Sequence, residues 1–140
     1  MTETAVRQPP RSAQLRWAGP LAIGIGVAVN GALFLIAEAF GVFPADVVDP
    51  GSGRPFALTT VVIATAVGAF GATVTYAVLD RLVTDADRWF RITAGVVLLA
   101  SFATPFTIPG APPAMIGLLL VMHTVVAGVS VWLFTVRGVD

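Results

Sequence analysis

The strongest constraint on the fold of this chain is a run of apolar residues long enough to cross a lipid bilayer, which occurs four times. The runs cover about residues 17–40, 56–79, 89–107 and 114–136. A helix rises ~1.5 Å per residue, so about 20 apolar residues cross the ~30 Å hydrocarbon core. In lipid every backbone polar group needs an internal partner, and helices provide one. The sequence therefore predicts an all-α polytopic membrane protein, an antiparallel bundle of four transmembrane helices.

The charged residues agree with this prediction because they are few and lie between the runs. The chain is 56% hydrophobic and 11% charged, whereas a soluble domain is about 25% charged. Residues 80–88 hold five charges and are expected in water as an ordinary solvated loop. Residues 1–16 are polar and are expected to form a disordered cytoplasmic tail. We expect one four-helix transmembrane domain over residues 17–137 and no second domain.

The placement of arginine predicts the orientation. Cytoplasmic flanks of membrane helices keep positive charge. Arg54 stands alone on one side, and all other arginines fall on the opposite side: Arg7, Arg11, Arg16, Arg81, Arg88, Arg91 and Arg137. Trp17, Trp89 and Trp132 lie toward that same side, as expected of residues at the headgroup level. We therefore expect a plasma (inner) membrane protein with both termini in the cytoplasm.

A different interpretation of the first run is a cleaved signal peptide. Arg16 precedes the run, and the run ends in Ala37-Glu38-Ala39, which resembles a cleavage site. This run is longer than the apolar part of a usual signal peptide, and its removal would leave three spans and disturb the arginine bias. We therefore keep it as a membrane span.

Composition also excludes several classes of function. The net charge is zero and there is no lysine, so we expect no nucleic-acid partner. The chain has no cysteine and one histidine, His123, which excludes thiolate zinc sites, iron–sulfur clusters and bis-histidine haem within one chain. We predict no metal and no cofactor.

Four polar side chains are expected at one level inside the membrane. Asn30, Thr65, Ser101 and His123 each lie about three to four helical turns from the arginine-rich end of their run. An unpaired polar group at that depth is costly, so we predict a hydrogen-bonded layer in which Asn30 and His123 meet across the bundle. We interpret this layer first as a structural clamp that fixes helix register, and alternatively as a ligand or proton site.

A carboxylate lies near the other end of the first run. Glu38 is close to the external surface, and we predict an interfacial ion pair with Arg54 of the following loop. A proton or cation site at Glu38 is the alternative.

Small residues indicate which helix faces pack closely, because membrane helices associate through close contact. Two stripes recur every four residues: Ala18, Ala22, Gly26 and Asn30 in the first run, and Ala64, Gly68 and Ala72 in the second. We expect each stripe to face the bundle interior or a partner.

Three short motifs resemble those of one known family: Trp89-Phe90-Arg91, Ser101-Phe102-Ala103-Thr104-Pro105-Phe106 and the Met122-His123 pair. The chain resembles, over nearly all of residues 17–137, an uncharacterised bacterial family of four-helix membrane proteins that is frequent in actinobacteria. The resemblance implies the same four-span layout and no activity. It singles out His123 and Ser101–Pro105 without assigning them roles.

The function predicted first is that of a non-enzymatic membrane protein that acts by packing, as a homo-oligomer or an accessory subunit of a larger membrane complex. The alternative is a small oligomeric transporter or channel in which Asn30, His123 and Glu38 line a path. An enzyme ranks third, because no nucleophile with a positioned base and no metal cluster can be assembled from these residues.

Overall fold

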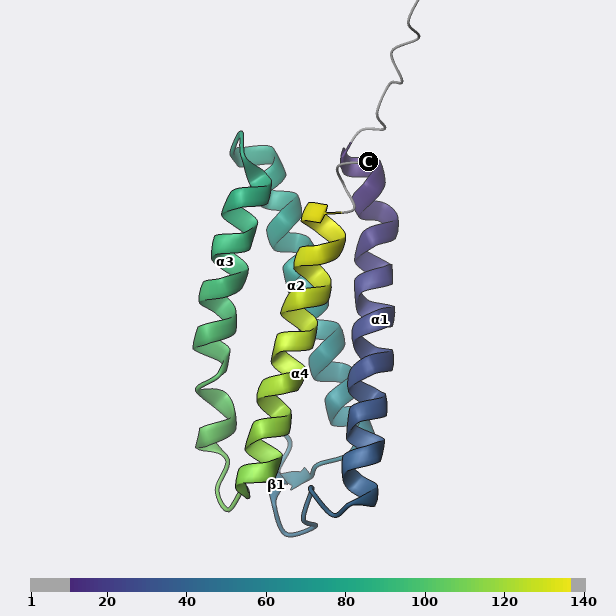
Figure 1. Cartoon of the computed structure of the whole chain (residues 1–140), viewed down its shortest axis with the longest axis vertical. Helices are drawn as coiled ribbons and strands as arrows, with labels where there is room; N and C mark the ends of the chain where they lie inside the picture. Colours follow the sequence, from purple (N-terminus) through teal and green to yellow (C-terminus); the bar gives the residue numbers. More distant parts are fainter. Residues whose placement is uncertain (1–10, 137–140) are drawn as a thin grey trace, which may run out of the picture.

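The computed structural model of the chain is a bundle of four long helices that run up and down (Figure 1). It describes residues 11–136. The helices are α1 (Arg11–Ala39), α2 (Leu58–Leu82), α3 (Ala86–Ser101) and α4 (Pro113–Val131), with a 3₁₀ turn η1 (Thr104–Thr107) after α3 and a π-helical turn η2 (Trp132–Val136) after α4. Four segments built on them are long and apolar enough to cross a membrane. The predicted all-α membrane fold is confirmed.

The predicted tail over residues 1–16 is wrong in its last part, because α1 begins at Arg11. Residues 1–10 lie outside the described part of the chain. The sequence after Arg11 contains Ala13 and Leu15, which favour a helix. The helix therefore starts before the apolar run that crosses the membrane.

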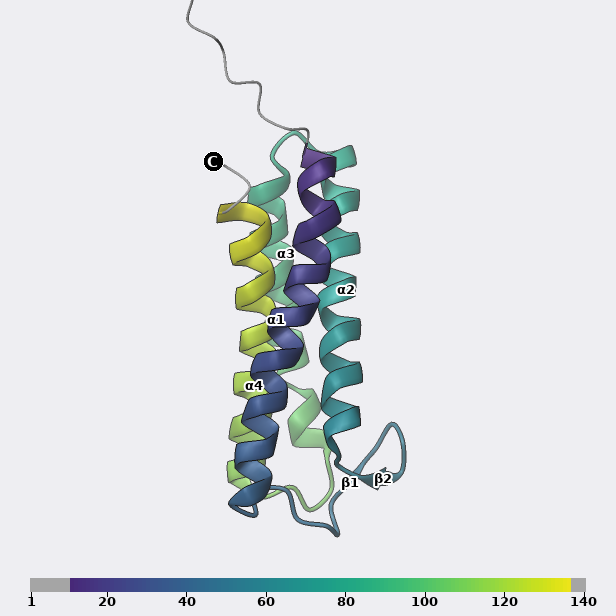
Figure 2. The ribbon, with the colours of Figure 1, turned by 90° about the vertical axis from the view of Figure 1, so that its right-hand side faces the viewer.

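The two ends of the bundle differ in charge. The start of α1, the turn between α2 and α3 and the end of α4 lie together at one end (Figures 1 and 2). This "basic end" carries Arg16, Arg81, Arg88 and Arg91, while Arg54 lies at the other end on strand β2 (Arg54–Pro55), paired antiparallel with β1 (Val48–Asp49). We call that other end the "hairpin end". The arrangement on which the orientation prediction depends is therefore present among the described residues.

The sequence analysis predicted a loop between the first two spans. The structure adds a short β-hairpin in that loop. The carboxylate of Asp49 accepts hydrogen bonds from the backbone N–H groups of Gly51 and Ser52, at 3.3 and 3.0 Å. Gly53 follows with a φ of +66°, a conformation that glycine adopts without strain. These local bonds shape the loop independently of the membrane helices.

Proline shortens α3. Pro105 has no N–H to donate to the carbonyl of Ser101, and the Thr104 hydroxyl donates to that carbonyl instead. The Ser101 hydroxyl likewise donates to the Leu98 carbonyl at 2.7 Å. The regular helix ends at Ser101, and the 3₁₀ turn η1 completes the segment.

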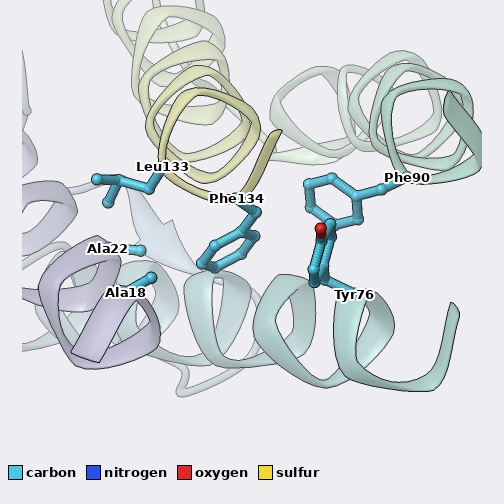
Figure 3. Close-up of a cluster of buried hydrophobic side chains, with 6 residues drawn as sticks. All are labelled: Ala18, Ala22, Tyr76, Phe90, Leu133 and Phe134. Atoms are coloured by element: carbon cyan, nitrogen blue, oxygen red, sulfur yellow. The ribbon is translucent and has the colours of Figure 1, made fainter. Parts of the chain in front are cut away.

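Buried apolar side chains form two clusters, one toward each end of the bundle. The cluster at the basic end contains Ala18, Ala22, Tyr76, Phe90, Leu133 and Phe134 (Figure 3). Its three rings come from α2, α3 and η2, with centroids 5.3 to 5.6 Å apart, which is a favourable separation for aromatic pairs. The cluster at the hairpin end contains Phe34, Val47, Val61, Met115, Leu119 and Met122.

The helices do not pack equally well. A third of the most apolar window of α1 is buried, but only 11% of that of α3. A Cβ on Gly19 of α1 would lie 2.8 Å from Thr73 Cγ2 of α2, and one on Gly26 would lie 3.2 Å from Thr65 Cγ2. Helix α2 thus approaches α1 so closely that only glycine fits at Gly19, while α3 leaves most of its surface uncovered.

Candidate functional site

A cleft of about 490 Å³ lies between α2, α3 and α4. None of its lining residues is charged, and most are apolar. The polar residues among them are Asn30 of α1, Thr60, Thr65 and Thr75 of α2, Thr93 and Ser101 of α3, and His123 and Ser130 of α4. All four residues of the predicted polar layer therefore line one cleft.

The amide of Asn30 links three helices. Its Nδ2 donates to Thr65 Oγ1 at 3.0 Å and to the Met122 carbonyl at 3.2 Å, and the side chain is 1% exposed. A carbonyl oxygen only accepts, so the nitrogen must face Met122. Asn30 Oδ1 is left buried with no hydrogen-bond partner in the described part of the chain.

The predicted layer is thus present in part, with one correction. Asn30 and Thr65 are bonded as expected, but Asn30 does not bond to the His123 side chain. It bonds to the backbone carbonyl of the preceding residue, Met122, because a carbonyl has two lone pairs and can accept a second hydrogen bond beyond that of its own helix. Ser101 makes its side-chain hydrogen bond within α3.

His123 is fixed by its own helix. Its Nδ1 lies 2.7 Å from the Leu119 carbonyl oxygen. Because that oxygen can only accept, Nδ1 carries the proton, and Nε2 of the neutral ring is a hydrogen-bond acceptor. His123 is half-buried in the cleft lining, so the ring adds an acceptor beside the segment to which Asn30 is bonded.

Ser130 is the fully buried one among the polar cleft residues that the sequence analysis missed. It is 1% exposed, and its Oγ, like Asn30 Oδ1, is buried without a partner among the described residues. Ser130 follows His123 by two helical turns and so lies on the same face of α4. The spacing from His123 is the feature of the sequence that could have identified Ser130 as a cleft residue.

The two small-residue stripes have different surroundings. The Ala18, Ala22, Gly26 and Asn30 stripe is buried within the bundle. The Ala64, Gly68 and Ala72 stripe lines the cleft, where Ala64 and Gly68 are exposed. The second stripe therefore lies along the cleft, and α4 approaches it at Gly68, where a Cβ would lie 3.4 Å from Val126 Cγ1.

The predicted ion pair of Glu38 and Arg54 is not formed. Both side chains are exposed, and no ion pair joins them in the described structure. An exposed pair contributes about 0–1 kcal/mol, too little to override a loop whose shape the Asp49 hydrogen bonds determine. Glu38 also does not line the cleft, so Asn30, His123 and Glu38 do not share one path within this chain.

Side-chain hydrogen bonds hold α3 at the basic end. The Tyr76 hydroxyl donates to Asp87 Oδ1 at 2.5 Å, and Arg91 Nε donates to Thr135 Oγ1 at 3.0 Å. The sequence predicted only a solvated loop around Asp87. With the ring cluster of Figure 3, these bonds anchor one end of α3 and leave its middle beside the cleft.

The arrangement defines a class of protein, the four-helix integral membrane proteins, here with a cleft within the membrane-spanning segments. The profile of a family of unknown function, DUF6069, matches residues 10–139, and the chain belongs to this family. No curated protein and no solved structure matches the chain. The expected membership of an uncharacterised family is confirmed.

Proposed function

We propose that this chain is a non-enzymatic membrane protein that holds a lipid-soluble molecule in the cleft between α2, α3 and α4. The observation that carries the proposal is the pair of buried, unpartnered polar atoms on the lining, Asn30 Oδ1 and Ser130 Oγ. Leaving a buried polar group unpaired costs about 1–3 kcal/mol. A bound molecule that supplies hydrogen bonds would offset that cost.

The size and setting of the cleft support the same function. Its volume of about 490 Å³ is within the range of ~300–1,000 Å³ that is usual for small-molecule sites. Gly68 and Gly71 lie exposed on its lining, in the interior of the α2 span. An opening at that depth meets hydrocarbon rather than water, which favours a lipid-soluble molecule.

The lining residues also support a non-enzymatic role. His123 is the one imidazole among them, and its Nδ1 is bonded to a backbone carbonyl. A general base of the usual kind is oriented by a carboxylate or a similar group and faces a nucleophile. No carboxylate lines the cleft.

The test is whether the purified protein retains a molecule in the cleft. We would isolate the full chain in nanodiscs, identify retained molecules by native mass spectrometry, and compare Gly71→Leu with Gly95→Leu. A Cβ on either glycine would meet nothing within 4 Å, but only Gly71 lines the cleft. We expect retention in the native chain and in Gly95→Leu, and loss in Gly71→Leu. Equal retention in all three would contradict the proposal.

A second candidate function, self-association or assembly into a larger membrane complex, has its own observation. Gly24, Ala28 and Ala32 recur every four residues on the exposed face of α1, and a Cβ on Gly24 would meet nothing within 4 Å. Such stripes let helix backbones approach closely. This face is separate from the cleft, so the two functions are compatible.

The absence of cysteine makes this candidate easy to test. Ala28→Cys places one thiol on the α1 stripe, and Gly95→Cys places one on an exposed part of α3. If α1 pairs with a second copy, oxidation in native membranes gives a disulfide dimer of the first variant and little of the second. Equal amounts of dimer from both would indicate random collision.

The orientation of the chain is also part of the proposal. We propose a bacterial plasma membrane protein with the basic end in the cytoplasm, supported by the position of Arg16, Arg81, Arg88 and Arg91 opposite Arg54. In intact cells an impermeant thiol reagent should label Ser52→Cys and not Thr84→Cys. The reverse labelling would overturn this orientation.

A further inference from the structure

We infer that the occupant of the cleft is a lipid-soluble molecule that carries an uncharged hydroxyl group at the level of Asn30. This inference rests on the proposed function, and it adds the chemistry that the site selects. Two independent features carry it: the lack of charge on the lining and the type of hydrogen-bonding atom that is left unpaired.

The lining excludes a charged group at this depth. It contains no aspartate, glutamate, lysine or arginine, so a phosphate or ammonium there would be buried without a counter-charge. An uncharged polar group is costly in hydrocarbon only when it is unpaired. The polar part of the occupant is therefore neutral.

The unpaired atoms determine that this group must donate a hydrogen bond. Asn30 Oδ1 can only accept, because the amide nitrogen is committed to Thr65 and Met122. In the neutral His123 ring with its proton on Nδ1, Nε2 is also an acceptor, next along α4 from Met122. A ketone, an ester or an ether has no hydrogen-bond donor and cannot pair with either acceptor. A hydroxyl group can donate a hydrogen bond to one of them.

Ser130 provides a second contact along the same cleft. It lies eight residues beyond Met122, about 12 Å along α4, toward the basic end. Its Oγ both donates and accepts, so it does not discriminate between kinds of polar group. The selectivity for a hydroxyl is therefore assigned to Asn30 and His123.

The experiment compares three probes of one chain length that differ in a single group: dodecanol, dodecyl methyl ether and dodecane, each tritiated. We would measure their binding to the full chain in phosphatidylcholine nanodiscs and subtract the uptake of empty discs. Because one hydrogen bond is worth about 0.5–1.5 kcal/mol and ~1.4 kcal/mol is tenfold, dodecanol should bind about three- to tenfold more tightly than the other two.

The variants assign the selectivity to residues. Asn30→Leu combined with His123→Leu should bring the ratio of alcohol to ether affinity to about one, and Gly95→Leu should leave it unchanged. Should the double variant fail to fold, the ratio should fall in at least one of the two single variants, of which His123→Leu is the milder because the imidazole bonds only to its own helix. An unchanged ratio in the double variant, or in both single variants, would overturn the assignment.

The failures of the two proposals are distinguishable. If all three probes bind equally above the level of empty discs, and Gly71→Leu removes all of that binding, the cleft holds lipid-soluble molecules without selecting a hydroxyl, and only this inference fails. If no probe binds above that level, the proposed function fails with it.

Discussion

The α1–α2 interface and the cleft beside α3 lie on neighbouring faces of α2, with Thr65 in both, and are built in opposite ways. At the interface, Gly19 and Gly26 bring α1 so close that Thr73 and Thr65 fill the space where a Cβ would be. At the cleft, a Cβ added to Gly71 would meet nothing within 4 Å. In lipid, small residues stabilise a helix pair only where a neighbour occupies the space they leave. The comparison teaches that this chain uses small residues both for packing and for leaving a space open.

The largest expected effect comes from breaking the close interface. Gly19→Leu would place a side chain where Thr73 Cγ2 already lies, and such overpacking costs about 1–3 kcal/mol. We expect a loss at the upper end of that range in the free energy of unfolding, measured by SDS titration in mixed micelles. Gly95→Leu on the exposed part of α3, where a Cβ would meet nothing within 4 Å, is the control and should change it little. A similar loss in both variants would show that the close contact is not the cause.

The next effect tests the polar layer between the two regions. Asn30→Leu removes the hydrogen bonds to Thr65 and Met122, and hydrogen bonds between membrane helices contribute about 0.6 kcal/mol each on average. We therefore expect a loss of about 1 kcal/mol by the same titration. Leu33→Ile on the same helix is a control for side-chain exchange in lipid. An unchanged free energy of unfolding would mean that the polar layer contributes to binding the occupant and not to the stability of the bundle.

A smaller and more local effect is expected where α3 is anchored. Tyr76→Phe keeps the ring packed on Phe90 and Phe134 but removes the hydroxyl that donates to Asp87. We expect amide hydrogen exchange at the start of α3 to become severalfold faster, while α1 is unchanged. Equal acceleration in both helices would indicate a global loss of stability.

The smallest effect is expected at Ser130. Ser130→Ala removes a buried hydroxyl that has no partner among the described residues, so the unliganded protein should be as stable as before or gain up to about 1 kcal/mol. Thermal unfolding in detergent measures this change. A clear loss would mean that the hydroxyl has a partner in solution, such as a bound water.

The sequence predicted the helices well because crossing lipid imposes both a length and an apolar composition on them. It also placed Asn30 and Thr65 at one level, since depth can be counted along a helix. It could not predict that Asn30 bonds to the Met122 carbonyl, because every residue has a carbonyl and none is distinctive. It failed for Glu38 and Arg54, because local bonds at Asp49 shape that loop. The small buried fraction of α3 depends on how all four helices pack together. The sequence of one segment alone does not determine that packing.

The position of Gly68 and Gly71 on the exposed lining, in the interior of the α2 span, determines how the cleft communicates with its surroundings. Under the proposed function, a lipid-soluble molecule reaches the cleft by sideways diffusion within the membrane and need not pass through water. Its occupancy would then follow its mole fraction among the surrounding lipids rather than its concentration in solution. A protein that works in this way would respond to the composition of the membrane that contains it.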